Sequence, residues 1–304
     1  YRITFTPDQN WLADKARKYP VILDPTVLHD KSSQFASGDF NRTVDSGSSQ
    51  TPKIETSFEE LQTDINTVGL WHMNDTSGSN VADSSGNSNT GTATGTTIVD
   101  GKLNKARSFN GTSDTISIAN ESNFDFERTS PFSIEAWFKT STTGVFQPIF
   151  SKMANSSPYT GYEFTIGTDG KPYVCFINTW ATNVIYTAST VVVNDGNWHH
   201  LAMTYTGSSN AAGVNFYADG VLTGKVTTYD TLSATMLNNL TPYIGSRDNA
   251  AYFFNGTIDE VRVSSVVRSP EEIKADAERR PYGVYTSPVI DFGQTPASNM
   301  KSPS

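Results

Sequence analysis

Carboxylate pairs and nucleophile motifs could give this 304-residue sequence a catalytic function. A retaining glycosidase, for example, needs two carboxylates about 5 Å apart. Asp259 and Glu260 are consecutive, and successive side chains of a strand point to opposite faces, so we expect that they cannot act on one bond. The sequence has no Gly-x-Ser-x-Gly elbow, no Cys with a partnered His motif and no phosphate-binding loop. These patterns predict a protein that is not an enzyme.

Oxygen donors are dense between Asn74 and Asn87. Calcium takes about six to eight oxygens from carboxylates, amides and backbone carbonyls. A structural calcium ion is therefore one interpretation of this loop. The other is that Asp75 and Asp83 form Asx turns without any metal.

Histidine and cysteine offer little for a transition metal. The residues concerned are His29, His72, His199, His200 and Cys175. Their spacing fits no zinc motif, so a tetrahedral site is not expected. Cys175 lies in an apolar alternation and is expected to be a buried structural thiol, and a single cysteine cannot form an internal disulfide.

Several aromatic residues occur in or beside Gly-, Asn- and Thr-rich stretches. They are Tyr159, Trp180, Tyr186, Tyr229 and Tyr252. Sugar rings present apolar C–H faces that stack on exposed aromatic rings, which makes these residues the candidates for ligand binding. Ordinary packing is the alternative for each of them.

Composition excludes some classes of function. The net charge is −9, and no dense basic run is present, so nucleic acid is not an expected partner. No stretch approaches the roughly 18 apolar residues of a membrane span. The first residue is Tyr1, without an initiator methionine or a signal peptide, which suggests a piece of a longer protein. Low charge with abundant Ser, Thr and Asn is typical of extracellular β-proteins.

Period-two hydrophobic alternation recurs from residue 68 onward, for example over 132–138, 198–205, 214–217 and 258–263. Helical periodicity is almost absent, apart from a short helix predicted after Ser269 by its N-cap, Pro270 and Glu272. The pattern predicts an all-β fold, a two-sheet antiparallel jelly-roll sandwich with one short C-terminal helix and flanking partial β segments.

Ordered motifs carry a resemblance to a known family. They are Val68–Met73, Asp83–Asn87, Ala106–Gly111, Phe132–Phe138, Gly196–Ala202, Phe216–Gly220 and Asn255–Val263. The chain resembles a laminin-G-like, concanavalin A-like jelly roll of the kind common in large secreted bacterial proteins, over residues 68–280. In similar sandwich proteins a calcium ion lies on the convex face. The resemblance assigns it to the side chains of Asp83 and Asp259 and the backbone oxygen of Gly111 or its neighbours.

Asn87 and Asp114 are further candidate ligands under the same resemblance. The related sandwich endoglucanases carry Glu-x-Asp-x-x-Glu, and nothing here matches that motif. The nearest acidic cluster, residues 121–127, has the wrong spacing. The resemblance therefore implies the fold without supplying a catalytic pair.

The segments outside the predicted sandwich are assigned separately. Residues 1–30, with Trp11–Asp14 and Ala16–Val21, resemble the end of a β-rich module of Rhs and wall-associated surface proteins. Residues 31–67 are predicted to be a linker or loosely packed strands, and residues 281–304 the start of a following segment. Short end segments cannot bury a core alone. We expect Ile3–Phe5 or Val289–Asp291 to pair with exposed strand edges of neighbouring modules or other copies of the chain.

Together these features predict a non-catalytic, calcium-stabilised module of a large extracellular or cell-surface protein, acting in adhesion or carbohydrate binding. Its expected partner is a glycan or a cell-surface or matrix protein. A structural spacer or protomer of a surface fibre or filament, without a small ligand, is one alternative, and a glycan-active enzyme is a second.

Overall fold

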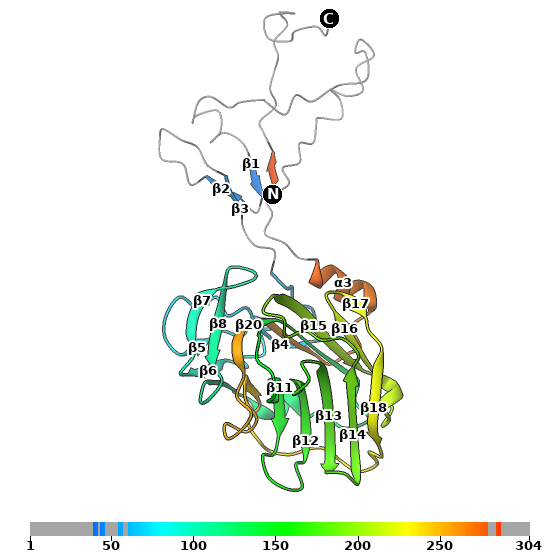
Figure 1. The fold of residues 1–304 in the computed structure, drawn as a ribbon. Helices are drawn as coiled ribbons and strands as arrows, with labels where there is room; N and C mark the ends of the chain where they lie inside the picture. Colours follow the sequence, from blue (N-terminus) through cyan, green and yellow to red (C-terminus); the bar gives the residue numbers. More distant parts are fainter. Residues whose placement is uncertain (1–38, 42, 46–53, 57–59, 279–283, 287–304) are drawn as a thin grey trace, which may run out of the picture. The chain divides into compact units, whose positions relative to one another are not determined.

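The computed structural model describes residues 39–41, 43–45, 54–56, 60–278 and 284–286 (Figure 1). The chain divides into two compact units, Glu60–Arg279 and a unit formed by Tyr1–Glu59 with Arg280–Ser304. Within the described residues, every helix is too short or too polar to reach across a lipid bilayer. The predictions for residues 1–30, Ile3–Phe5 and Val289–Asp291 concern residues outside the described ranges.

The larger unit is a sandwich of two antiparallel sheets, as predicted. The eight-stranded sheet contains β4 (Thr67–Trp71), β7 (Thr97–Asp100), β8 (Lys105–Asn110), β10 (Phe132–Lys139), β15 (Trp198–Tyr205), β16 (Val214–Ala218), β17 (Val221–Leu222) and β20 (Asn255–Ser264). The nine-stranded sheet contains β5 (Asn80–Val81), β6 (Gly91–Thr94), β9 (Thr115–Ile118), β11 (Gln147–Met153), β12 (Gly161–Ile166), β13 (Pro172–Thr179), β14 (Asn183–Ser189), β18 (Lys225–Asp230) and β19 (Tyr243–Ile244).

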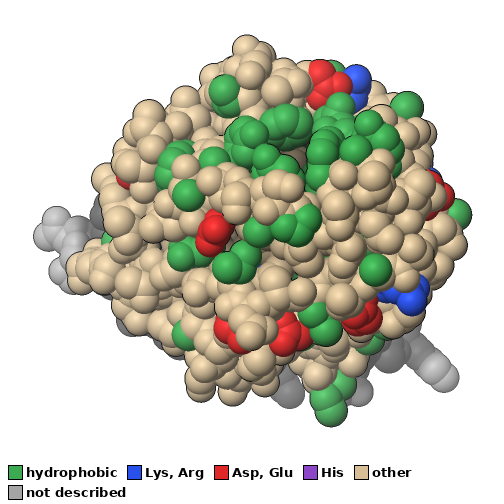
Figure 2. Space-filling view, turned by 90° about the horizontal axis from the view of Figure 1, so that it is seen from below, with side chains coloured by type: hydrophobic (Ala, Val, Ile, Leu, Met, Phe, Trp, Pro, Cys, Tyr) green, Lys and Arg blue, Asp and Glu red, His purple; other side chains and the backbone are tan. Residues whose placement is uncertain are grey.

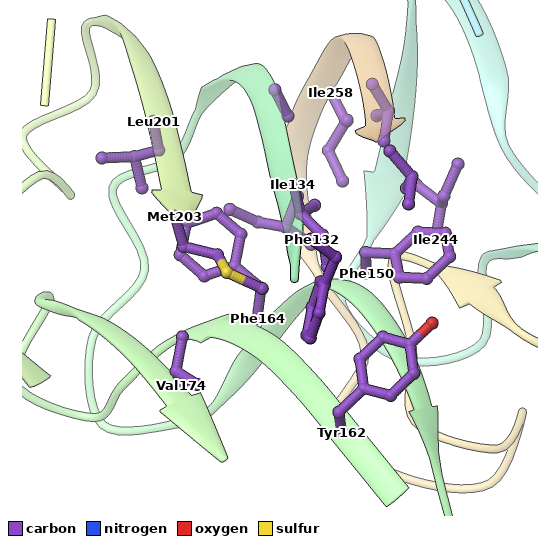
Figure 3. Close-up of a cluster of buried hydrophobic side chains, with 14 of the residues drawn as sticks. Phe132, Ile134, Phe150, Tyr162, Phe164, Val174, Leu201, Met203, Ile244 and Ile258 are labelled. Carbon is purple, nitrogen blue, oxygen red and sulfur yellow. The ribbon is translucent and has the colours of Figure 1, made fainter. Parts of the chain in front are cut away.

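Alternating apolar side chains of the two sheets form the core between them. Phe132 on β10 lies 5.4 Å, ring centre to ring centre, from Tyr162 and from Phe176 of the opposite sheet. Figure 3 shows residues of both sheets in this layer, including Ile134, Val174 and Met203. This packing fixes which face of each strand is turned outward.

The outer face of the eight-stranded sheet is also covered. Helix α3 (Pro270–Ala277) begins with the predicted Ser269 and Glu272 capping box, and its Ile273 packs on Ala202 and Tyr217. Residues 60–66 cover a further part, since Leu61 is buried and Asp64 pairs with Arg268 at 2.6 Å. As a result, β10 is buried on both faces except at its last residue.

A β-bulge on β20 overturns the prediction that Asp259 and Glu260 point to opposite faces. The pairing of β10 with β20 shifts register here, and Glu260 has a φ of +51°. Ile258 and Val261 both lie in the core, so the two residues between them are turned away from it. Both carboxyl groups are buried under the loops that cover the outer face.

The smaller unit has two pairs of short strands. β1 (Asp39–Asn41) pairs with β21 (Val284–Thr286), and β2 (Thr43–Asp45) pairs with β3 (Ile54–Thr56), all antiparallel. The β1–β21 pair joins segments that precede and follow the sandwich in the chain.

Candidate functional site

The outer face of the nine-stranded sheet carries a group of aromatic side chains. On β13, Val174 and Phe176 point into the core, so Tyr173 and Cys175 point outward. Tyr186 of β14 lies opposite Cys175, and Tyr229 of β18 lies opposite Tyr186. Strand alternation therefore brings these tyrosines to one face.

The rings on this face contact one another in a continuous series, which we call the aromatic band. It consists of Trp180, Tyr229, Tyr186, Tyr173, Phe146 and Tyr252. Trp180, in the β13–β14 hairpin, has its ring centre 5.4 Å from Tyr186 and 5.8 Å from Tyr229. Tyr186 is 5.2 Å from Tyr173, which continues the series along the sheet.

Phe146 joins Tyr173 to Tyr252, the last ring of the band. Its ring centre is 6.2 Å from Tyr173 and 5.7 Å from Tyr252. Trp180 is 41% exposed and Tyr252 is 42% exposed. Figure 2 shows hydrophobic side chains gathered around a hollow on the face that is seen from below. The rings at the two ends of the band, Trp180 and Tyr252, are therefore open to solvent.

Four of the five aromatic residues predicted from the sequence belong to the band. The fifth, Tyr159, packs beside it against the small buried cluster that contains Met153 and Cys175. Burial raises the pKa of Tyr186 and Tyr173 above the usual range, so their hydroxyl groups stay protonated at neutral pH and can donate hydrogen bonds.

A buried ion pair lies beneath the band. Glu163 of β12 accepts hydrogen bonds from Nε and Nη2 of Arg247 at 2.9 and 2.6 Å. The Arg247 guanidinium lies over the Tyr252 ring, 4.4 Å from its centre. Burial opposes the charge on Arg247, but Glu163 outweighs it and raises the Arg247 pKa. Ser151, opposite Glu163 on β11, has a buried hydroxyl with no hydrogen-bond partner.

Cys175 lies on the same face and is buried, as predicted. Burial raises the pKa of its thiol, and the nearby Glu163 charge raises it further. A thiol of this kind stays protonated and is a poor nucleophile. It packs under the rings without supplying reactivity.

Two of the predicted calcium ligands organise the loop after β4. The Asp83 carboxylate accepts hydrogen bonds from the backbone N–H groups of Leu70, Ser85 and Asn89 at 2.8–3.0 Å. The Asn87 side chain donates to the backbone oxygen of Thr67 at 3.0 Å. Asp83 therefore forms the Asx turn that the sequence also allowed.

Of the other predicted ligands, Gly111 and Asp114 lie in the turn between β8 and β9, and Asp259 lies on β20. Asp114 accepts a hydrogen bond from the Asn110 backbone at 3.0 Å, and Gly111 forms the turn next to it. Asp259 Oδ2 accepts from Leu103 N–H at 3.0 Å, whereas its Oδ1 is buried without a hydrogen-bond partner. Burial, and then the charge of Glu260, raise the pKa of Asp259 well above its usual range.

Within residues 60–278, one group of three His, Cys or acidic side chains brings its ligand atoms within 4.8 Å of one another: Glu60, His72 and Glu260. His72 Nδ1 lies 2.9 Å from both oxygens of Glu260 and 3.9 Å from Glu60 Oε2. Burial lowers the pKa of His72, but the Glu260 hydrogen bond and charge outweigh this and raise it. None of the three was a predicted ligand.

Sequence reasoning missed Tyr173, Phe146 and the pair of Glu163 with Arg247. The alternation of Tyr173 with Val174 and Phe176 was visible, and it could have placed Tyr173 on the outer face. The ion pair could not be found in this way, because the two residues are 84 positions apart.

Comparison with known proteins supports the fold. The family described as the concanavalin A-like lectin/glucanases superfamily, of the laminin G type, matches residues 110–274. The family match begins at residue 110 and leaves out the predicted Rhs-like segment 1–30, so that resemblance is not supported. No curated protein sequence matches the chain.

Solved structures share the sandwich at low identity. The binding domain of Paraclostridial Mosquitocidal Protein 1 is 16% identical with a TM-score of 0.54 over 70% of this chain. The receptor binding domain of a botulinum neurotoxin C/D mosaic serotype is 14% identical with a TM-score of 0.52 over 70% of this chain. This chain spans about half of each, 52% and 51%.

A third similar structure is domain 4 of AbnA, an arabinanase from Geobacillus stearothermophilus in complex with arabinotriose. It is 20% identical with a TM-score of 0.48, and the match covers 70% of this chain and 98% of that one.

Proposed function

Because the chain belongs to the concanavalin A-like lectin/glucanase superfamily, we propose that its sandwich is a non-catalytic module that binds carbohydrate along the aromatic band. The observation that carries this proposal is the unbroken series of ring contacts from Trp180 to Tyr252 on one solvent-facing sheet. We place the module in an extracellular or cell-surface protein that acts in adhesion, with glycans as its partners.

The physical properties of the band fit a sugar ligand. Stacking needs ring faces held in place, and each ring of the band is fixed by its neighbours. Sugar hydroxyls need donors and acceptors at the edge of the stacking surface, which the phenol groups of Tyr173, Tyr186 and Tyr229 supply. A surface with rigid rings and polar tips loses little conformational entropy on binding.

The fold supports a binding role by analogy only. The two toxin domains with the same sandwich are binding domains of larger proteins, which is compatible with the role proposed here. The proposal that the module lacks catalysis rests on the absence of a glycosidase motif from the sequence.

A glycan array followed by calorimetry on the strongest ligand tests the proposal. We expect Trp180→Ala and Tyr186→Ala each to weaken binding about tenfold, the loss of one stacked ring. Trp198→Ala is the matched control, because Trp198 is a half-buried tryptophan of the eight-stranded sheet, where Lys139 lies over it. Equal effects of Trp180→Ala and Trp198→Ala would contradict a site at the band, and turnover of any glycan would contradict a non-catalytic module.

Calcium binding is a separate part of the proposal. The buried, unpartnered Oδ1 of Asp259 supports a cation there, because a carboxylate oxygen without a donor is costly to bury. Asp83 and the backbone oxygen of Gly111 stay in the proposed set, with Asn87 and Asp114 as further candidates. Such an ion would stabilise the fold and has no part in the chemistry of the band.

A further inference from the structure

We propose that the aromatic band selects uncharged glycan chains and rejects anionic ones, such as uronate, sulfated or sialylated glycans. This inference rests on the proposed carbohydrate binding and names the class of glycan. It comes from the charges beside the rings and from the length of the band.

The two charges beneath the band neutralise each other inside the protein. Glu163 is fully buried and holds Arg247 through the two hydrogen bonds described above. A guanidinium with its charge compensated by a buried carboxylate offers little attraction to a further anion. Arg247 therefore does not form an anion site beside the band.

A surface ion pair lies beside Tyr173, and an acidic residue lies near Tyr252. Beside Tyr173, Lys171 Nζ lies 2.7 Å from Asp169 Oδ2, and the Tyr173 hydroxyl lies 3.3 Å from the same oxygen. Asp248 follows Arg247 in the loop that carries Tyr252 and adds a negative charge at that end. The whole chain has a net charge of −9, which repels anions at longer range.

The length of the band indicates how the glycan lies. Successive ring centres are 5.2–6.2 Å apart from Trp180 through Tyr186, Tyr173 and Phe146 to Tyr252. Three of these four contacts are edge to face, with ring planes 80–83° apart, so the band offers several separate ring contacts rather than one flat platform. Separate contacts along one face fit consecutive sugar units of one chain better than a single terminal sugar. The ligand is therefore an unbranched, neutral chain bound along its length.

Matched pairs of glycans provide the test: neutral β-glucan, xylan, mannan and arabinan, each beside a carboxymethylated or sulfated form of the same backbone. Affinity is measured by gel retardation and calorimetry at about 0.05 and 0.5 M NaCl. We expect at least one neutral chain to bind with little salt dependence, and its anionic form to bind about tenfold more weakly at low salt. Binding of anionic forms alone would overturn this inference while leaving carbohydrate binding intact. Absence of binding to every glycan would instead overturn the proposed function.

A charge variant separates local from global effects. Asp248→Asn removes the negative charge at the Tyr252 end of the band, and we expect it to raise affinity for the anionic form about threefold without affecting the neutral form. Asp100→Asn makes the same change in net charge on the eight-stranded sheet, where Asp100 pairs with Lys105 at 2.7 Å, and should have no effect. Equal gains in both variants, or no gain in either, would overturn the local assignment.

Discussion

The buried pair of Glu163 and Arg247 contributes to the unfolding free energy of the protein only while both side chains are present. In Arg247→Met, Glu163 stays buried without its counter-charge, and we expect a loss of about 3–5 kcal/mol in unfolding free energy. The double variant with Glu163→Gln removes both charges and should recover most of that loss. Urea denaturation at neutral pH measures both. A loss below about 1 kcal/mol in Arg247→Met would show that the pair is solvated.

Asp259 allows a residue-scale test of the proposed calcium. Without a cation, the buried Asp259 opposes folding, because its raised pKa means that stability falls as pH rises above the ordinary aspartate range. In EDTA, Asp259→Asn should therefore melt at or above the wild-type temperature. In calcium at about a hundredfold excess over Kd, the wild type should gain about 3 kcal/mol and the variant should gain little.

The order of the two melting curves is the decisive readout for calcium. Indifference of the wild type to both EDTA and calcium would contradict the site. Asp195→Asn is the control, because Asp195 pairs with His199 and lies outside the proposed ligand set.

The predictability of single residues depends on how local their environment is. Aromatic candidates such as Trp180 and Tyr186 were identified because neighbouring glycines and polar residues mark loops and edges. The capping residues of α3 were identified for a similar reason. The partner of Glu163 was not, since only the folded sheet brings Arg247 to it.

At the scale of elements, buried ion pairs hold helix α3 against the eight-stranded sheet. Arg262 on β20 pairs with Glu135 on β10 and with Asp276 on α3. Burial opposes ionisation of Glu135, but the charge of Arg262 and contacts with His200 outweigh it and lower the Glu135 pKa to about 2. This ionised network links β10 to α3 through Arg262.

This network predicts a pH dependence of stability. The folded pKa of Glu135 lies below its ordinary value of 4.5, so its contribution is complete above pH 4.5 and is lost as pH falls toward 2. We expect Glu135 to account for about 3 kcal/mol of the stability lost across that interval. Urea denaturation at several pH values, for the wild type and Glu135→Gln, measures the difference. Parallel pH profiles for the two proteins would contradict the lowered pKa.

Strands could be predicted where hydrophobic alternation is regular. They could not be predicted in detail where that alternation is interrupted. Alternation indicated β10, β15, β16 and β20 and the two-sheet fold. It failed at Asp259 and Glu260, because a bulge adds one residue to a strand without a distinctive sequence. Burial of both faces of β10 was equally hidden, since Glu135 is polar yet lies under α3.

At the scale of the whole molecule, residues 60–66 belong physically to the sandwich. Leu61 is 1% exposed, and its backbone N–H donates to Glu260 at 2.9 Å. The backbone oxygen of Gln62 accepts from Arg262 at 3.0 Å, and Asp64 holds Arg268 through both carboxylate oxygens. The segment therefore supplies further partners to Glu260, Arg262 and Arg268, which are buried on and after β20.

The boundary of the folding unit follows from these contacts. A polypeptide of residues 60–278 should unfold in one cooperative transition, because it keeps both sheets, α3 and the covering segment. A polypeptide of residues 68–278 leaves Arg268 and Glu260 with fewer partners in a buried setting, and we expect it to be less stable by about 3 kcal/mol or more. Both should bind the same glycan equally well at low temperature, because the aromatic band lies on the opposite sheet. Equal urea midpoints for the two polypeptides would show that residues 60–66 cover the sheet without stabilising it. A loss of glycan affinity in a folded 68–278 polypeptide would instead show that the two sheets are coupled through the core.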